Sequence, residues 1–553
     1  HYVGNYIPVT MLFHSLSWLF FEGSDWGHHL MNILLHLLNG ILIYQLGKRL
    51  FKSSLVANMG AIIFLLHPLQ IESVGWIAEL KNVVSTLFFL LGALYYLDYK
   101  EKNENSKYLF SLLFFVLACL SKSSAIVFPL CLIGIDFLYN KNVSLKLIIE
   151  KTPFLILSII FGLVNIKTQT ADQFINHAHE FPIYQRIGLA GLALSKYFSL
   201  FIIPIKQSVI YPFPDVVSGS ILKGYFMLCA LAALFVILFK QKNKNLVFIL
   251  AFILINFILV LQFIPFGEVL YADRYMYVPI IGFAWLIGIF VSKYKIPDAV
   301  ALLFITLVLG IFSFNRIKVW TSALSLYEDI IKKYPDEFVA LNSAGVECMF
   351  LNQDDKALEY LNRAVKVAPD NYKGFYNRGL LHLKNKKPEL AINSFNQTLK
   401  LYDYHKAYAG RASAYYMISD FPKAILDANY VLRNDKQITS SSASRAHFVL
   451  GNCYSDMNKL EEAMKEYNKC LEINNEEPDF YFKRAIVFGK KQDFNSCLGD
   501  LDICLKFNPK YYEAYYWKGV AKVNLKLNPC EEFKLAAVQN IQPAINAYNK
   551  YCR

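Results

Sequence analysis

The chain has 553 residues, of which 55% are hydrophobic and 16% aromatic, and its mean hydropathy is +0.32. This composition is too apolar for a wholly water-soluble protein of such length. The formal net charge is +13, but the basic residues are spread along the chain and form no stripe of the kind that nucleic acids require, so we expect no nucleic-acid partner. The apolar segments all precede residue 317, which predicts an all-α membrane domain over 1–316 and a soluble domain over 317–553.

The chain begins with His1 rather than Met, and the first residues lack the pattern of a signal peptide, so we expect a truncated or processed start. Residues 1–28 are rich in aromatic side chains and predict an interfacial segment. Ten apolar segments follow, each close to the length that a bilayer requires. These predicted spans are 29–47, 54–67, 82–98, 107–121, 123–140, 148–165, 221–239, 246–264, 276–292 and 298–315.

One long connection, over residues 166–220, separates the sixth predicted span from the seventh. Within it, residues 187–203 are apolar but are interrupted by Lys196. This pattern predicts a helix that lies along the membrane interface and does not span the bilayer.

Basic residues alternate between the short loops, which predicts the orientation of the membrane domain. Loops rich in Lys and Arg face the cytoplasm. The rich loops hold Lys48, Arg49, Lys52, Lys100, Lys102, Lys107, Lys141, Lys146, Lys240, Lys242, Lys244, Lys293 and Lys295, whereas the intervening short loops hold Lys81, Lys122 and Arg274. Residues 1–28, the 65–81 loop and everything after 316 are therefore predicted to lie on the non-cytoplasmic side.

The stretch from Leu65 to Leu87 (LLHPLQIESVGWIAELKNVVSTL) is unusually polar for a segment between two apolar helices. Polar groups at a membrane boundary are costly unless they line a wet cavity. The stretch therefore indicates a reaction site at the membrane surface. The alternative is an interfacial loop in which Trp76 anchors the chain and Lys81 reaches the lipid headgroups.

Small residues recur after residue 317 with a period close to 34. They are Gly345, Gly379, Ala412, Gly451, Ala485 and Gly519. This period predicts about six tetratricopeptide repeats, which stack into an α-solenoid with a groove for peptides or partner proteins. One longer step, between Ala412 and Gly451, is attributed to a Ser-rich insert over 438–444.

The cysteines lie in two settings. Those in the apolar segments are expected to be small apolar fillers. In an oxidising compartment Cys530 and Cys552 could form a disulfide, a possibility that the sequence leaves open. Cys497 and Cys504 lie too far apart on one helix to form a bridge. Because no Cys or His cluster has metal-ligand spacing, we predict no metal site, and dependence on a divalent cation stays open.

Several segments resemble the bacterial relatives of the transmembrane and tetratricopeptide-repeat O-mannosyltransferases. These segments are NYIPVTML, HHLMNILLHLLNGILIYQL, HPLQIESVGWIAELKNVVSTLFFLLGALYYLDY, LSKSSAIVFPLCLIGIDFLY, SVIYPFP and YADRYMYVPIIG. The resemblance covers essentially the whole chain. It implies a GT-C-like membrane domain, a polyprenyl-phosphate sugar as donor substrate and Ser or Thr of an exported protein as acceptor.

The resemblance also implies a catalytic Asp in the first external loop, which in the family shortly precedes the segment matching NYIPVT. That position lies upstream of His1. In the second loop the family pattern resembles HPLHVESVAWISERKDVL, and this chain has Gln70, Leu80 and Asn82 in place of the second His, the Arg and the Asp. The loss of that Arg puts activity in question, although Lys81 could supply a positive charge.

Within the chain, Glu72 is the main candidate for the catalytic carboxylate, and a helix-capping or solvated Glu is the alternative. Arg274 is the first candidate for binding the donor phosphate, and an Arg that only reaches the headgroups is the alternative. Lys81 and Lys122 are further candidates for the phosphate. The remaining candidates, expected to line the cavity, are His67, Glu79, Asn82, His29 and Asp273.

The favoured hypothesis is a membrane O-glycosyltransferase whose repeats bind the acceptor protein. Two alternatives remain, namely a non-catalytic membrane-anchored repeat scaffold for envelope assembly and a lipid-linked polysaccharide polymerase or ligase. We expect a bacterial inner-membrane protein, in contact with membrane lipid, with periplasmic repeats, or an endoplasmic-reticulum protein with lumenal repeats in a eukaryote.

Overall fold

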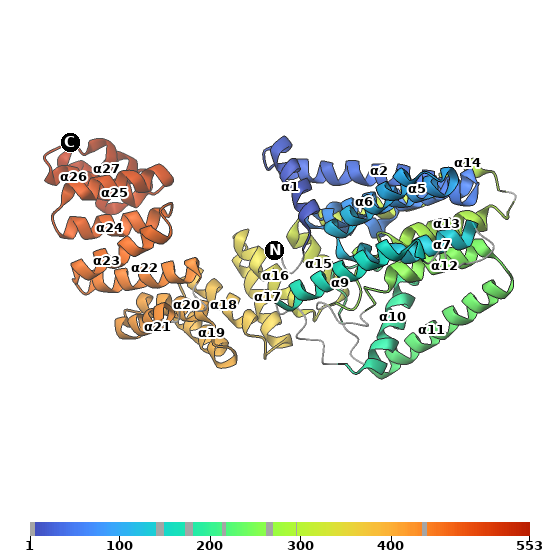
Figure 1. The fold of residues 1–553 in the computed structure, drawn as a ribbon. Coiled ribbons are helices and arrows are strands. Elements are labelled where there is room, and N and C mark those ends of the chain that lie inside the picture. The colour runs from blue at the N-terminus through green and yellow to red at the C-terminus, as the bar shows by residue number, and fades with distance from the viewer. Residues whose placement is uncertain are drawn as a thin grey trace. The chain divides into compact units, whose positions relative to one another are not determined.

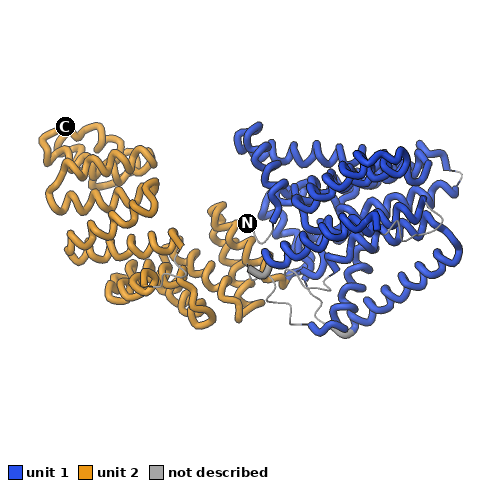
Figure 2. The backbone as a smooth tube through the Cα atoms, in the orientation of Figure 1, with its two compact units in different colours: residues 1–335 blue, residues 336–553 orange. Residues whose placement is uncertain are grey.

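The computed structural model describes residues 6–139, 149–171, 181–212, 217–261, 269–294, 296–433 and 439–552. Every described secondary-structure element is a helix, which confirms the predicted all-α class (Figure 1). The chain forms two compact units, His1–Pro335 and Asp336–Arg553 (Figure 2). Lys141, Lys146 and Lys295, which entered the orientation argument, lie outside the described residues.

Unit 1 is a helical bundle with an aromatic core. The ring of Trp285 is fully buried, and its centroid lies 5.3 Å from that of Phe51 and 5.5 Å from that of Phe252. The described elements are α1 (Pro8–Phe21), α2 (Asp25–Phe51), α3 (Ser54–Leu66), η1 (Pro68–Gln70), α4 (Ile71–Gly75), η2 (Ile77–Glu79), α5 (Leu80–Lys102), α6 (Asn105–Ser121), η3 (Ser123–Val127), α7 (Phe128–Tyr139), α9 (Thr152–Ala171), α10 (Ile183–Ile202), α11 (Val217–Lys240), α12 (Lys244–Phe257), η4 (Asp273–Met276), α13 (Pro279–Val291), α14 (Asp298–Ile317), η5 (Lys318–Trp320) and α15 (Ala323–Lys333).

Four helical segments in the described part of the chain are long and apolar enough to cross a membrane. They are Asp25–Phe51, Ile77–Lys102, Gly219–Lys240 and Asp298–Trp320, and a fifth results if α3 and the segment Pro68–Gly75, bent by 53°, count as one span. Other predicted spans coincide with apolar helices of only 10–17 residues, namely α6, Ser123–Tyr139, Thr152–Thr168, α12 and α13. The chain is thus a multi-pass membrane protein, and the number of ten spans stays a prediction.

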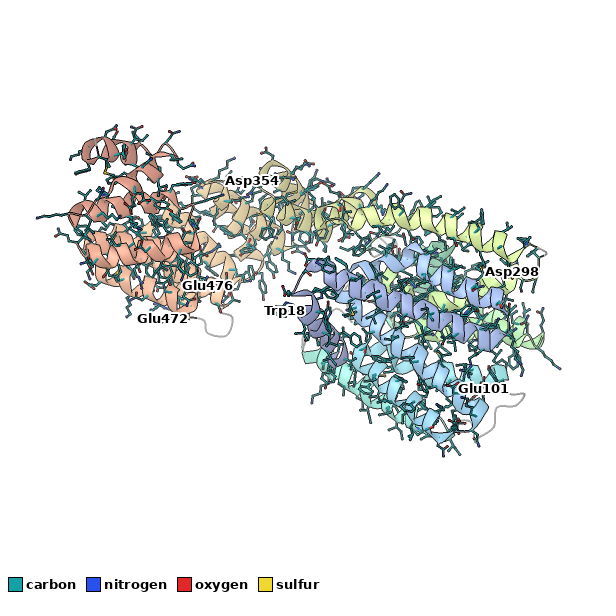
Figure 3. The ribbon with its side chains drawn as sticks, turned by 90° about the horizontal axis from the view of Figure 1, so that it is seen from above. Trp18, Glu101, Asp298, Asp354, Glu472 and Glu476 are labelled. Atoms are coloured by element: carbon teal, nitrogen blue, oxygen red, sulfur yellow. A yellow bond between two sulfur atoms is a disulfide. The ribbon has the colours of Figure 1, made fainter. Side chains whose placement is uncertain are left out.

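Loops that were predicted to share one side of the membrane lie at the same end of the bundle. Figure 3 shows Glu101, in the last turn of α5, and Asp298, the first residue of α14, near one end, whereas Trp18 of α1 lies at the other. At the end that carries Glu101, Arg49 pairs with Asp98 and Glu101 at 2.8 Å each. This arrangement agrees with the alternation of basic loops.

The predicted interfacial helix over 187–203 corresponds to α10. Figure 1 shows α10 running crosswise to α12 and α13, which is the direction expected of an interfacial helix beside spanning ones. Its N-terminal half touches α11 backbone to backbone, because a Cβ atom on Gly191 would lie 2.1 Å from the Gly224 carbonyl oxygen and one on Gly224 would lie 1.7 Å from that of Gly188. Only glycine permits this approach.

The first helix after residue 317, α15, belongs to unit 1, so the two compact units divide at residue 335, whereas the predicted end of the membrane domain is residue 316. Ion pairs explain this placement. Asp329 of α15 accepts from Arg316 at 2.8 Å and from Lys333 at 2.6 Å, and Lys333 also donates to the Gln207 carbonyl oxygen. These bonds attach α15 to α14 and to the segment after α10.

Unit 2 consists of antiparallel helix pairs. In its described residues these are α16 (Phe338–Phe350) with α17 (Asp354–Val367), α18 (Tyr372–Lys384) with α19 (Pro388–Leu401), α20 (His405–Met417) with α21 (Phe421–Arg433), α22 (Ser440–Asp456) with α23 (Leu460–Ile473), α24 (Pro478–Lys490) with α25 (Phe494–Phe507), and α26 (Tyr512–Asn524) with α27 (Cys530–Ala537), followed by α28 (Gln542–Tyr551). The recurring small residues let the paired helices meet. A Cβ atom on Gly379 would lie 2.7 Å from the ring of Phe395, and one on Gly451 would lie equally close to that of Tyr467.

The Ser-rich stretch is not an inserted loop where the structure describes it. Residues 440–444 form the first turn of α22, which has 17 residues against 13 in α20, and Thr439 caps it by accepting from the Ser442 N–H at 3.2 Å. The longer step between repeats therefore lengthens a helix. At the end of the unit, Cys530 and Cys552 form a disulfide that joins the start of α27 to the end of α28. Cys497 and Cys504 are free and buried, as expected.

Candidate functional site

The polar stretch between α3 and α5 folds into three short turns that direct its acids inward. His67 ends α3 in an extended conformation, and Pro68, which cannot continue the helix, starts η1. The bend brings α4 against η4, so that Glu72 faces Arg274 although the two residues are 202 positions apart. A cluster of acids and bases forms where these turns meet.

Glu72 and Arg274 form the shortest ion pair of the cluster. The guanidinium donates to Glu72 Oε1 at 2.6 Å, and the backbone N–H of Arg274 donates to Glu72 Oε2 at 3.0 Å. Glu72 is 2% exposed, whereas the Arg274 side chain is 17% exposed. Both carboxylate oxygens are thus occupied, and this geometry suits a residue that holds Arg274 in place better than a base that meets a substrate hydroxyl.

Glu79 is the second buried acid and connects three neighbours. It accepts from Lys81 Nζ at 3.0 Å and from Asn82 Nδ2 at 2.5 Å, and Arg274 Nε lies 3.9 Å away. Asn82 Nδ2 is also 3.2 Å from Ser73 Oγ. Asn82 thereby links α4, η2 and the first turn of α5.

Lys122 brings a third cation to the cluster from the turn between α6 and η3. Its ammonium donates to Asn82 Oδ1 and lies 5.9 Å from the centroid of the Tyr275 ring. Burial lowers the pKa of the Lys122 ammonium to about 8, although the negative charge of Glu79 opposes this effect. Lys122, Asn82, Arg274 and Tyr275 line a cavity of about 40 Å³, which suffices for a few water molecules.

Asp273 lies beside Arg274 but faces another partner. The Tyr211 hydroxyl donates to Asp273 Oδ1 at 2.6 Å and accepts from the Ser208 N–H at 2.9 Å. Burial, together with the charge of Glu72, raises the pKa of the Asp273 carboxyl to about 7. At neutral pH this side chain is therefore close to its titration midpoint.

Of the five residues predicted to line the cavity, only Asn82 does so; Glu79 and Asp273 lie beside it, and two others have different positions. His67 accepts from the Leu69 N–H through Nδ1 at 3.2 Å, lies 3.0 Å from the Phe201 carbonyl oxygen through Nε2, and stacks on the Phe201 ring at 5.1 Å. It orders the bend and does not line the cavity. His29 lies on α2, half-buried, and among the described residues it does not line the cavity either.

Sequence reasoning missed Tyr211, Tyr275 and Asn256. Tyr275 packs its ring against Arg274, with 5.1 Å between the guanidinium carbon and the ring centroid. Asn256 lines the cavity from the end of α12. An Asn near the end of the apolar part of α12 was a detectable signal, because a polar amide in a membrane segment needs a partner. Nothing in the sequence pointed from Tyr211 to Asp273.

The cluster is suited to hold an anion at a membrane boundary. Three cations, Lys81, Lys122 and Arg274, converge from separate elements on two fully engaged acids, Glu72 and Glu79. Fixed cations of this kind bind phosphate oxygens through charge-assisted hydrogen bonds. Among the described residues no group of three His, Cys, Asp or Glu side chains is placed to hold a metal ion.

Residues 7–166 match the family model described as dolichyl-phosphate-mannose-protein mannosyltransferase. Residues 349–406, 376–437 and 451–492 match tetratricopeptide repeat models. Among solved structures, a tetratricopeptide repeat protein from Parabacteroides merdae covers 42% of this chain and 87% of its own, at 16% identity and a TM-score of 0.33.

Two curated relatives are protein O-mannosyl-transferases. F38B6.6 of Caenorhabditis elegans is 25% identical over 350 residues, which cover 60% of this chain and 49% of that protein. TMTC3 of Homo sapiens is 21% identical over 610 residues, which cover 98% of this chain and 65% of that protein. The chain thus spans about half to two thirds of the length of these relatives. The chain carries a segment similar to the mannosyltransferase family model, followed by tetratricopeptide repeats, and it is similar to protein O-mannosyl-transferases over most of its length.

Proposed function

We propose that the protein is a glycosyltransferase that moves a sugar from a polyprenyl phosphate to Ser or Thr hydroxyls of exported proteins. The observation that carries this proposal is the convergence of Lys81, Lys122 and Arg274 beside a cavity at the polar bend. The names of the relatives support the same class of reaction. In this proposal the polyprenyl-phosphate sugar is the donor substrate, and dependence on a divalent cation stays open.

The reaction exchanges one bond at the anomeric carbon of the sugar. The acceptor oxygen forms the new bond to this carbon, and the bond to the phosphate oxygen breaks. The phosphate leaves with the electron pair, and the proton of the hydroxyl passes to a general base. The cations stabilise the growing negative charge on the phosphate, and they do so strongly because they are held in place before the reaction begins.

Glu72 acts in this proposal as a positioning residue. It receives both the guanidinium and the backbone N–H of Arg274, so it fixes the direction in which Arg274 offers its remaining donors. Glu79 does the same for Lys81. The proton acceptor is then a different carboxylate, and the resemblance implies an Asp of the first external loop.

The repeats recruit the acceptor protein. A solenoid offers a long surface for an extended polypeptide, and attachment of a weak binding surface to the reaction site raises the effective concentration of the acceptor. In this proposal the repeats lie on the non-cytoplasmic side, in the periplasm of a bacterium or in the lumen of the endoplasmic reticulum of a eukaryote.

The test is sugar transfer in membranes that contain the protein. Polyprenyl-phosphate mannose and a mixture of secreted proteins are supplied, and hexose on Ser or Thr is measured by mass spectrometry. We expect Lys81→Ala, Lys122→Ala and Arg274→Ala each to lower the rate by about 100-fold. Lys102→Ala, at the exposed end of α5, is the matched control and keeps the rate. Transfer that none of the three substitutions affects would remove the cluster from the mechanism.

Glu72→Gln tests the positioning role separately. It keeps the size of the side chain but weakens the hold on Arg274, so we expect a higher KM for the donor and an unchanged KM for the acceptor. A loss of kcat at every pH with an unchanged donor KM would instead make Glu72 the base. If no polyprenyl-phosphate sugar is transferred while the repeats still capture partners, the scaffold alternative is favoured.

A further inference from the structure

An apolar groove lies between α7, α11 and α12, on the part of unit 1 remote in sequence from the polar bend. Its volume is about 340 Å³. Ten residues line it, and all are apolar: Leu130, Ile133, Gly134, Phe137, Phe235, Phe239, Val247, Phe248, Ala251 and Ile255. A groove of this composition binds hydrocarbon, because nothing in its lining can form a hydrogen bond through a side chain.

The groove exists because α11 stands apart from α7 and α12. α7 and α12 are in close contact, since a Cβ atom on Gly134 would lie 3.2 Å from the Phe248 ring. α11 diverges from them in Figure 1. Only 11% of the most apolar stretch of α11 is buried in the protein. The space between α11 and the α7–α12 pair is therefore lined by apolar side chains of all three helices.

The end of the groove next to the α11–α12 turn is basic. Lys240, Lys242 and Lys244 stand within five residues there. The turn is in contact with the groove, because the Lys244 ammonium lies 5.7 Å from the centroid of the Phe137 ring, and Phe137 stacks on Phe239 at 6.4 Å. Hydrocarbon lining and positive charge thus meet at one end of one groove.

We propose that this groove binds an acyl chain of an anionic glycerophospholipid, with the phosphate of the lipid at Lys240 and Lys244. The loop charges predict that this end faces the cytoplasm, where anionic lipids are concentrated and each nearby basic residue contributes about 1 kcal/mol. The site is separate from the donor site, and the inference does not depend on the proposed function.

The tail of a polyprenyl phosphate is the competing occupant. Ile255, at the other end of the groove, precedes Asn256 of the cavity beside Lys122 and Arg274. A donor bound there would place its phosphate at the cavity, at the opposite end of the groove from the three lysines of the α11–α12 turn. The accumulation of charge at the turn favours the phospholipid.

The experiment uses the full chain purified in mild detergent, with lipid retention measured by native mass spectrometry. The probes are phosphatidylglycerol and phosphatidylcholine with identical acyl chains. We expect preferential retention of phosphatidylglycerol, and we expect Lys240→Ala and Lys244→Ala each to weaken it about fivefold. Ala251→Phe, which fills the groove from α12, should reduce retention of both lipids. Lys102→Ala, on a helix that contributes no side chain to the groove, is the control.

Two results would overturn the proposal. One is equal retention of the two phospholipids by the unaltered protein. The other is displacement of phosphatidylglycerol by polyprenyl phosphate, with binding that Ala251→Phe abolishes and that the two lysine substitutions leave unchanged, because the groove then holds the donor tail. Helix content and monodispersity of each variant show that a lost lipid is not a lost fold.

Discussion

Charged residues are arranged differently in the two units, and the difference distinguishes a site from a scaffold. In unit 2 two Arg–Asp pairs repeat the same bidentate geometry. Arg411 binds Asp427 through Nε at 2.7 Å and Nη2 at 2.9 Å, and Arg484 binds Asp500 in the same way at 2.7 and 2.8 Å. A further Nη1 bond, to Asn396 and Asn468 respectively, connects each Arg to the preceding helix pair.

In unit 1 the cluster at the polar bend occurs once and is unbalanced. Lys81, Lys122 and Arg274 face Glu72 and Glu79, and the neighbouring Asp273 has a pKa near neutrality. The three cations at the bend outnumber the two buried glutamates beside them, and this excess suits the binding of an anion. Comparison of the two units therefore indicates where function resides, and four measurements can test it.

The largest expected effect is on the stability of unit 1. Arg274→Met leaves the buried Glu72 without its cation and with only the backbone N–H of residue 274 as a donor, which should cost about 3–5 kcal/mol. The double variant Glu72→Gln/Arg274→Met removes the unpaired charge and should recover most of that loss. Thermal unfolding in detergent, followed by tryptophan emission, measures both. If the single variant is as stable as the double, the pair is not tightly coupled.

The terminal disulfide should have the next largest effect. It closes a loop of 22 residues between Cys530 and Cys552, for which loop entropy gives about 3 kcal/mol. Cys530→Ser/Cys552→Ser should therefore accelerate hydrogen exchange in α27 and α28 and leave α20 to α23 unchanged. If hydrogen exchange is accelerated uniformly through unit 2, the disulfide stabilises the whole solenoid and not only α27 and α28.

The repeated pairs of unit 2 should contribute less. Arg411→Met should cost about 1–2 kcal/mol, because Arg411 pairs with the single acid Asp427, whereas Arg274 lies against both Glu72 and Glu79. Lys423→Ala, which breaks the exposed pair with Asp420, is the control and should change stability by less than about 0.5 kcal/mol. A cost for Arg411→Met equal to that for Arg274→Met would erase the contrast between the units.

The smallest effect concerns pH and donor binding. Lys122 loses its charge as pH rises through about 8, and Asp273 gains negative charge as pH rises through about 7. Both changes weaken binding of an anion. We expect the affinity for a phosphodiester donor, whose own charge is constant in this range, to fall about fivefold between pH 7 and pH 9. Lys122→Arg should keep the donor affinity constant at the high-pH end of this range, because Arg does not lose its charge there. If the affinity of the unaltered protein does not change with pH, Lys122 does not bind the phosphate.

The repeats were predictable because their rule is local. One small residue in every 34 decides whether two helices can meet, and the structure pairs Gly379 with Phe395 and Gly451 with Tyr467 accordingly. The polar bend was also visible, because Glu72, Glu79 and Lys81 are costly where they stand.

The roles within the site were not predictable. The bonds of Glu72 to Arg274 and of Tyr211 to Asp273 join residues 202 and 62 positions apart, and no spacing rule connects them. Only the folded chain shows that Glu72 is fully engaged and that His67 orders the bend.

The glycine contact between α10 and α11 also determines the dimensions of a site that it does not touch. The helices α10 and α11 cross at Gly188, Gly191 and Gly224. Near the C-terminal end of α10, Phe201 stacks on His67, and α11 ends at the lysine-rich turn. A single methyl group at Gly224 would clash with the Gly188 carbonyl oxygen and would force α10 and α11 to cross at a different angle. Because α11 forms one wall of the apolar groove, the width of the groove would change as well. Gly224→Ala would thus change the width of that groove without changing any residue that lines it.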